Sequence, residues 1–224
     1  MPRCNRCRVP PCKSGRGRGT TILSIHPDDL VKQYRLGFRD FQRADFYGLT
    51  LAHANLALLD AEGADFGEAR FREVDLSRAN LQAANFLGAQ VREAILRGAS
   101  FKRACLTGSR FLRVDLCHSD LSETRLQQAE WRRISMYRAT LCAANLERST
   151  FHATNFNRVS FRHAMLYKTS FRDCSFQGAD LSQCRVFVAV DLRESSYDAT
   201  TQFPPRFNPI TAGMVSRKSA QTHA

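Results

Sequence analysis

The chain has 224 residues, with 33 Lys and Arg against 21 Asp and Glu, and a formal net charge of +12. This length is enough for one independently folded domain with its own apolar core. No apolar run is long enough for a membrane helix or a secretory signal, so we expect neither. The eight cysteines are expected to be thiols, and a cytoplasmic location is the simplest expectation.

The first 26 residues form a separate compositional class. Residues 1–27 carry a charge of +6 with no acidic residue, and they include the run Ser14-Gly15-Arg16-Gly17-Arg18-Gly19. Such a segment has too few apolar residues to fold, so residues 1–26 are predicted to be a disordered basic tail. Whether this tail is functional or an artefact of the start site is left open.

Three cysteines in this tail resemble the beginning of a zinc site. Cys4, Cys7 and Cys12 lie close together, but the nearest candidate for a fourth ligand is His26. Structural zinc sites need four closely held ligands. We therefore predict no metal site.

A short capping helix is predicted over residues 27–38. Proline stands at its first position, two acids stand in its first turn, and Gly37 suits its end. Leu30, Val31 and Tyr34 are expected to cover the first coil of the domain that follows. Stacked repeats need such a cover, because their open ends can promote aggregation.

A five-residue repeat then dominates the chain. From Phe41 to Val186 every fifth residue is a large apolar one, with few exceptions, and 25 of these 30 positions are Leu or Phe. A small residue usually stands two positions earlier, as in Ala79-Asn80-Leu81. Neither a helix nor a straight strand places residues five apart on one side. The chain must therefore bend once in every unit.

The composition of these bends agrees with tight corners. Six of the seven glycines between residues 40 and 186 occupy the second position after the large apolar residue: Gly48, Gly63, Gly88, Gly98, Gly108 and Gly178. Glycine adopts the backbone angles that tight corners require. Repeated corners coil the chain, and stacked coils bury a continuous apolar column.

The repeat resembles the pentapeptide-repeat family, whose unit is a small residue, Asp or Asn, then Leu or Phe and two variable positions. This resemblance implies an all-β fold, a right-handed quadrilateral β-helix with one unit on each side. We assign residues 39–197 to this solenoid. Four units per coil make roughly 7.5 coils, about 36 Å long at ~4.8 Å per stacked strand.

Residues 198–224 are predicted to be a closing segment and tail. We place a one-residue slip of the repeat frame after Val186, since Leu192 follows it instead of residue 191. Prolines from Pro204 onward stop the repeat. The segment is similar to the C-terminal ends of cyanobacterial-type pentapeptide-repeat proteins, which implies a regulatory or developmental role through protein contacts.

One face of the predicted solenoid collects basic residues, because positions 20 apart share a side. Four acids are interleaved with them, which leaves a charge of +4 on this face. The candidate interaction face consists of eight arginines: Arg70, Arg72, Arg92, Arg110, Arg113, Arg132, Arg133 and Arg172. Such a face suits an acidic protein surface or a nucleic acid, or it is simply a solvated wall.

No catalytic or cofactor-binding set emerges from the repeats. His53, His118, His152 and His163 share no column of the coil. The recurring Asp and Asn residues are explained by local hydrogen bonds to the backbone rather than by paired-carboxylate catalysis. We therefore expect a protein that is not an enzyme and needs no cofactor.

The predicted function is a non-catalytic scaffold that mediates protein–protein interaction. The alternative is a nucleic-acid-associated protein that uses the basic tail and the arginines, with weak binding expected from the interleaved acids. A third hypothesis is a DNA-mimicking inhibitor of gyrase, of the quinolone-resistance type. Mimicry of DNA needs a strongly negative surface, and residues 40–186 carry +4. The sequence does not identify a partner or an oligomeric state.

Overall fold

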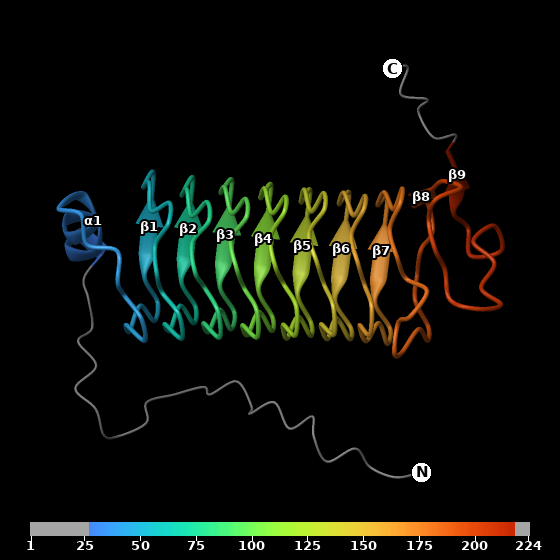
Figure 1. The fold of residues 1–224 in the computed structure, drawn as a ribbon, viewed down its shortest axis with the longest axis horizontal. Coiled ribbons are helices and arrows are strands. Elements are labelled where there is room, and N and C mark those ends of the chain that lie inside the picture. The colour runs from blue at the N-terminus through green and yellow to red at the C-terminus, as the bar shows by residue number, and fades with distance from the viewer. Residues whose placement is uncertain (1–26, 218–224) are drawn as a thin grey trace, which may run out of the picture.

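The computed structural model describes residues 27–217, so the predicted tail at residues 1–26, with its three cysteines, lies outside the described residues. The body is a long stack of coils, with α1 at one end and β8 and β9 at the other (Figure 1). Within residues 27–217, no helix is both long and apolar enough to span a bilayer.

Helix α1 (Pro27–Arg35) lies against the first coil. Its Leu30 is fully buried, and Val31 and Tyr34 pack against the same core, as predicted. The helix ends two residues before Gly37, which has a φ of 95° and donates its N–H to the Tyr34 carbonyl at 3.0 Å. A residue with positive φ at this position is a common helix terminator.

Seven strands stack into one parallel sheet along the body, in chain order. They are β1 (Thr50–Ala52), β2 (Arg70–Arg72), β3 (Gln90–Arg92), β4 (Arg110–Leu112), β5 (Glu130–Arg132), β6 (Thr150–His152) and β7 (Ser170–Arg172). Bridges 20 residues apart also run along the other three sides, as in Asn55↔Asp75, Asp60↔Asn80 and Asp65↔Asn85. The chain is therefore a right-handed four-sided β-helix, and the predicted fold is confirmed.

The core is a continuous column of the repeated apolar residues. Phe86, Leu116 and Leu146 are at most 1% exposed. Trp131 stacks on Phe111 with 4.6 Å between ring centroids, and its indole Nε1 donates to Ser109 Oγ at 3.1 Å. Ser109, at one of the small inward positions, therefore accepts the hydrogen bond of the one indole N–H in the core. The periodicity did not predict this hydrogen bond.

The corners need a left-handed backbone, as the six repeat glycines indicated. These glycines have φ between 65° and 69°. At most of the other corners, a residue with a side chain adopts the same positive φ, for example Leu58 (φ 63°), Arg138 (φ 57°) and Lys168 (φ 54°). Because L-residues adopt this conformation only at a cost of about 1–2 kcal/mol, the packed core must hold these corners in place.

The recurring acids before the large apolar residues hold the backbone at these corners. Oδ1 of Asp45 accepts the N–H of Tyr47 at 3.0 Å, and Oδ1 of Asp75 accepts the N–H of Ser77 at 2.8 Å. Asp115 makes the same bond to the N–H of Cys117 at 2.9 Å. The local backbone role predicted for these residues is confirmed.

The slip of the repeat frame occurs earlier than predicted. Met165 bridges Val186, 21 residues away, so the extra residue lies before Val186 and not after it. The N–H groups of Arg185 and Val186 both point to the Ala164 carbonyl, at 2.9 and 3.4 Å. This is a bulge. Phe187, and not Val186, therefore packs inward against the core. Because Val186 and Phe187 are adjacent and both apolar, the sequence pattern did not show where the repeat frame shifts.

The C-terminal end continues the stack with irregular chain. Strand β8 (Ser196–Tyr197) pairs in parallel with β9 (Val215–Ser216). Between them, Phe203 and Phe207 contact each other with ring centroids 5.1 Å apart. Met214 is 6% exposed and joins the core. The closing segment therefore supplies both apolar cover and one further strand.

Candidate interaction surface

The sheet β1–β7 forms one flat wall of the solenoid. In each strand the middle residue is buried and the two flanking residues point outward. The pairing keeps exact 20-residue steps, as in Arg72↔Arg92. Outward side chains therefore form straight columns on a rigid backbone, which suits recognition because little ordering is required on binding.

The structure brings the eight predicted arginines together on this wall and on the corner beside it. Two stand at first positions of strands, four at third positions and two at the following corner. In that order they are Arg70 and Arg110; Arg72, Arg92, Arg132 and Arg172; Arg113 and Arg133. The column of third positions is interrupted by Leu112 and His152.

Several of these arginines contact acids on neighbouring coils. Arg113 Nη1 lies 2.5 Å from Glu93 Oε1, and Arg110 Nε lies 3.2 Å from Glu130 Oε2. Arg72 Nε lies 3.2 Å from Oε1 of its neighbour Glu73. All of these side chains are at least one-third exposed, so each pair adds at most about 1 kcal/mol to stability. Their main effect is to reduce the positive charge of the wall.

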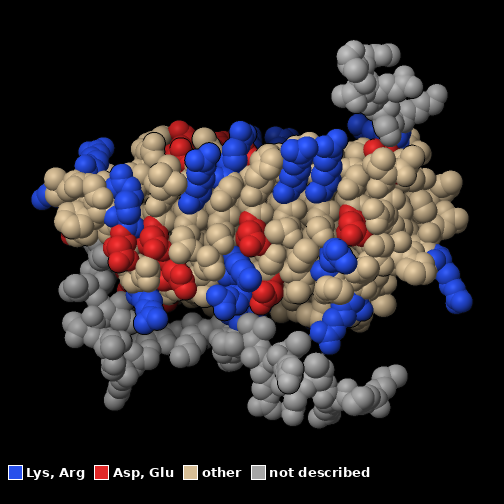
Figure 2. Space-filling model, viewed as in Figure 1, with Lys and Arg blue, Asp and Glu red and all other residues tan. Residues whose placement is uncertain are grey.

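The remaining charge is concentrated on a subset of four arginines. Within residues 27–217, Arg70, Arg92, Arg132 and Arg133 form no ion pair with an acid. Figure 2 shows an interrupted row of basic side chains along the upper part of this face, with acidic side chains mostly below them and further basic ones near the lower margin. The wall therefore presents a mixed pattern of charge with a few free guanidinium groups.

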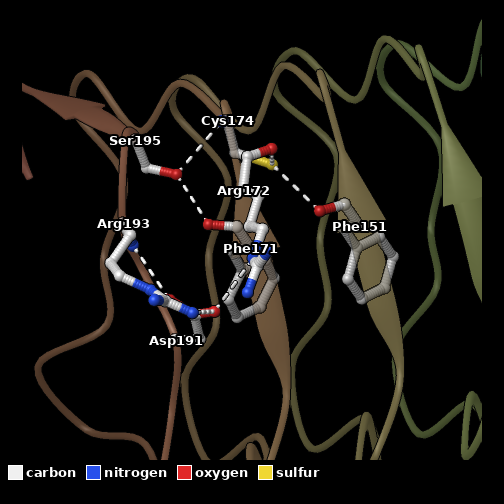
Figure 3. Close-up of polar contacts among 7 residues, drawn as sticks. All are labelled: Phe151, Phe171, Arg172, Cys174, Asp191, Arg193 and Ser195. Carbon is white, nitrogen blue, oxygen red and sulfur yellow. Dashed lines mark hydrogen bonds and ion pairs between the residues drawn. The ribbon is translucent and has the colours of Figure 1, made fainter.

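Arg172, at the end of the wall, is held by the coil that follows the bulge. Asp191 accepts from Arg193 Nε at 2.9 Å and from Arg172 Nε at 3.1 Å, as Figure 3 shows. These contacts, led by the Arg193 hydrogen bond, hold the pKa of Asp191 well below its usual range. Arg172 thus has a structural partner, and the bulge before residue 186 hid this contact from the sequence.

Below this surface, the buried side chain of Ser195 forms hydrogen bonds to the preceding coil. Its Oγ donates to the Phe171 carbonyl at 2.8 Å and accepts the N–H of Cys174 at 3.0 Å (Figure 3). The thiol of Cys174 points to the Phe151 carbonyl at 3.7 Å. Ser195 therefore connects the coil after the bulge to the last regular coil.

The thiols beneath the surface are poorly suited to nucleophilic chemistry. Burial raises the pKa of Cys174 and of Cys184 to about 12, so both are protonated at neutral pH. Cys174 is buried and Cys184 half-buried. In residues 27–217, no three His, Cys, Asp or Glu side chains are grouped so that they could hold a metal ion.

One surface cluster was not predicted. The ring of Tyr137 lies 5.3 Å from the guanidinium carbon of Arg138 and 5.8 Å from that of Arg158, and His118 packs edge-on at 5.9 Å. The three basic residues stand at positions 20 apart, so the column could have been found from the period. Tyr137 stands in the adjacent column, and nothing in the sequence pattern indicated that its ring contacts these basic residues.

The sequence and the fold were compared with known proteins. A family model described as pentapeptide repeats matches in eight copies, over residues 40–78, 75–113, 119–158 and 144–183. No curated protein matches the chain.

Three solved structures illustrate what the fold is similar to. HetL from the cyanobacterium Nostoc sp. strain PCC 7120, a pentapeptide repeat protein involved in heterocyst differentiation regulation, is 19% identical; the match covers 86% of this chain and 93% of HetL, with a TM-score of 0.35. Alr5209, a pentapeptide repeat protein from Nostoc PCC 7120, is 23% identical over 87% and 98% of the two chains, with a TM-score of 0.18. QnrB1, a plasmid-mediated fluoroquinolone resistance protein, is 16% identical over 76% and 90%, with a TM-score of 0.34.

Proposed function

The chain belongs to the pentapeptide-repeat family, and on that premise we propose that it is a non-catalytic scaffold that presents the β1–β7 wall to a protein partner. The observation that carries this proposal is the wall itself. It combines a flat seven-strand backbone in exact register with four arginines that have no acid partner within residues 27–217. A rigid surface with fixed charges favours specific protein contacts at low ordering cost.

The absence of catalysis is part of this proposal. It is supported by the local backbone bonds that occupy the repeated acids, and by the raised pKa of the buried Cys174 and of the half-buried Cys184. The expectation that every cysteine is a thiol is wrong for Cys105, which is disulfide-bonded. We nevertheless propose a cytoplasmic location, since the other four cysteines of residues 27–217, Cys117, Cys142, Cys174 and Cys184, are free thiols. A regulatory role, expected from the closing segment, belongs to the same proposal.

The experiment compares two triple variants in a pull-down from the native cell. In the first, Arg92, Arg132 and Arg133 of the wall are changed to Glu. The control changes Arg78, Arg103 and Arg148 to Glu; these are exposed arginines on the other three sides. Loss of a stoichiometric partner in the first variant alone supports the proposal, whereas equal retention by both variants contradicts it.

Nucleic-acid binding is the second candidate and is ranked lower. Acids contact at least half of the eight predicted arginines, and phosphate binding needs concentrated, uninterrupted charge. We expect duplex DNA to bind at micromolar or poorer affinity near physiological salt. Tight binding that weakens steeply with salt, and that the wall triple variant abolishes, would reverse this ranking.

A further inference from the structure

The first strand of the wall has an outer edge whose main-chain groups have no partner within residues 27–217. In β2, the N–H of Arg70 donates to the Leu49 carbonyl at 2.7 Å, and the Arg72 carbonyl accepts the N–H of His53 at 3.0 Å. Both bonds point toward the preceding coil. The equivalent groups in β1 are the N–H of Thr50 and the carbonyl of Ala52, and neither is hydrogen-bonded within residues 27–217.

Helix α1 covers the core at this end but not the strand edge. Its Leu30 is fully buried, and Tyr34 Oη donates to the Ala57 carbonyl at 2.5 Å, so one carbonyl of the first coil is satisfied. The main-chain groups of a helix bond to one another and are not free to pair with a strand. Among residues 27–217, the edge of β1 therefore stays open beside α1.

A groove of about 580 Å³ separates this edge from the helix. Val31 and Leu36 line it from α1 and the turn after it, and Thr50, Leu51 and Ala52 line it from β1. Leu36 is 69% exposed. A volume of this size lies in the range of peptide and ligand sites, and five extended residues span roughly 16 Å. The groove therefore fits a short extended segment with apolar side chains facing inward.

The charge of the groove distinguishes among possible occupants. Lys32 and Arg35 stand exposed on its helical side, and within residues 27–217 neither pairs with an acid. On the strand side, His53 Nδ1 is already held by Glu73 Oε2 at 2.9 Å. Carboxylates on the occupant would face Lys32 and Arg35, where they gain charge-assisted hydrogen bonds.

We propose that an extended, acid-bearing segment of a partner protein binds in this groove as an added strand along β1. Its main chain would bond to Thr50 and Ala52 as each coil bonds to the next, and its carboxylates would lie near Lys32 and Arg35. Strand addition of this kind obtains affinity from main-chain hydrogen bonds and specificity from alternating side chains. A second copy of the chain fits less well, because its terminal strand β9 has only two residues.

This site lies at the end of the wall and does not depend on the free arginines of the wall. The two proposals therefore fail separately. Substitution of Arg92 and Arg132 tests the wall, and substitution at Lys32, Arg35 and Thr50 tests the edge of β1.

The test selects peptides from a random eight-residue display library on the immobilised full-length chain. Selected peptides are then labelled, and their affinity is measured by fluorescence polarisation. We expect acid-rich peptides that bind at least tenfold more weakly to the Lys32→Glu/Arg35→Glu variant and to Thr50→Pro. The matched control, Arg78→Glu/Arg103→Glu on other sides of the solenoid, should change the affinity less than twofold.

A second measurement does not depend on the folding of any variant. Methylation of alternate backbone nitrogens in the selected peptide should abolish binding in one phase of alternation only, because a strand bonds along one edge. Failure to enrich any peptide overturns the proposal, as does binding insensitive to methylation or to Thr50→Pro. Concentration-dependent self-association that Thr50→Pro abolishes would assign the edge to a second copy and also overturn it.

Discussion

The two ends of the solenoid are covered in different ways. At the C-terminal end the chain adds main-chain partners: the N–H of Val215 donates to the Ser195 carbonyl at 2.8 Å, and that of Arg217 to the Tyr197 carbonyl at 2.7 Å. At the N-terminal end α1 lies against the first coil, and the N–H of Thr50 has no acceptor within residues 27–217.

Both ends nevertheless protect the core. Leu30 of α1 is fully buried, and Met214 of the closing segment is 6% exposed. Covering apolar side chains and continuing the main-chain ladder are therefore separate tasks. A helix performs only the first, because its own hydrogen bonds are internal, whereas an added strand performs both.

The largest effect should come from a charge placed in the core that both ends share. Leu116→Asp introduces an unpaired carboxylate at a residue with no exposed surface, so we expect both ends to unfold together. Circular dichroism and limited proteolysis would measure this. His152→Asp, on the exposed wall, is the control and should leave the fold intact. Survival of either end in the Leu116 variant would show that the core is not one cooperative unit.

The next test asks whether the two covers stabilise the core equally. Leu30→Ala and Met214→Ala each remove a buried side chain, so each should lower the free energy of unfolding by about 2–4 kcal/mol. Denaturant titration followed by the fluorescence of Trp131 would measure it. A cost at only one end would mean that the cover at the other end is not coupled to the stack.

A matched pair of proline variants tests the difference in main-chain bonding. Val215→Pro removes a donor that is used, and it should cost about 2–3 kcal/mol. Thr50→Pro removes a donor at the open edge, and it should cost less than about 0.5 kcal/mol, because proline is tolerated at a free strand edge. Thermal unfolding of both variants gives the comparison. Equal costs would contradict the open edge at β1.

Acid should weaken the contact between the coil after the bulge and the end of the wall. The pKa of Asp191 is lower in the folded chain than the ordinary value near 3.9, so the folded state binds fewer protons as the pH falls. Its stabilisation is therefore complete above about pH 5 and is lost as the pH drops below about 4. We expect Asp191→Asn to cost about 1–2 kcal/mol at pH 7 and progressively less as the pH falls from about 4 toward 2, because the carboxylate stays ionised in the folded chain well below its ordinary pKa. A difference that does not change with pH would exclude an electrostatic role.

The smallest effect concerns the strained corners. Leu58 has a φ of 63° and is 60% exposed, so Leu58→Gly relieves backbone strain and should stabilise the first coil by at most about 1 kcal/mol. The reverse change, Gly108→Ala, should destabilise by a similar amount, since an added Cβ meets nothing within 4 Å and only the backbone angle matters. Melting temperatures in opposite directions would confirm this, and shifts in the same direction would contradict it.

The sequence alone was enough to predict the solenoid, the inward column and the shared wall of the arginines. Burial of every fifth residue and the need for a corner are local properties that each unit repeats, so one correct frame places about 150 residues. The position of Gly37, the corner glycines and the backbone role of Asp45 and Asp75 follow from the same local chemistry.

Only the tertiary structure decided which of those residues are available for binding. Arg172 is paired because a bulge brings Asp191 beside it, and two adjacent apolar residues, Val186 and Phe187, hid that bulge from the periodicity. The open edge of β1 likewise depends on a helix standing where a strand would otherwise lie. Contacts between coils and at chain ends join residues far apart in sequence, and a local repeat carries no information about them.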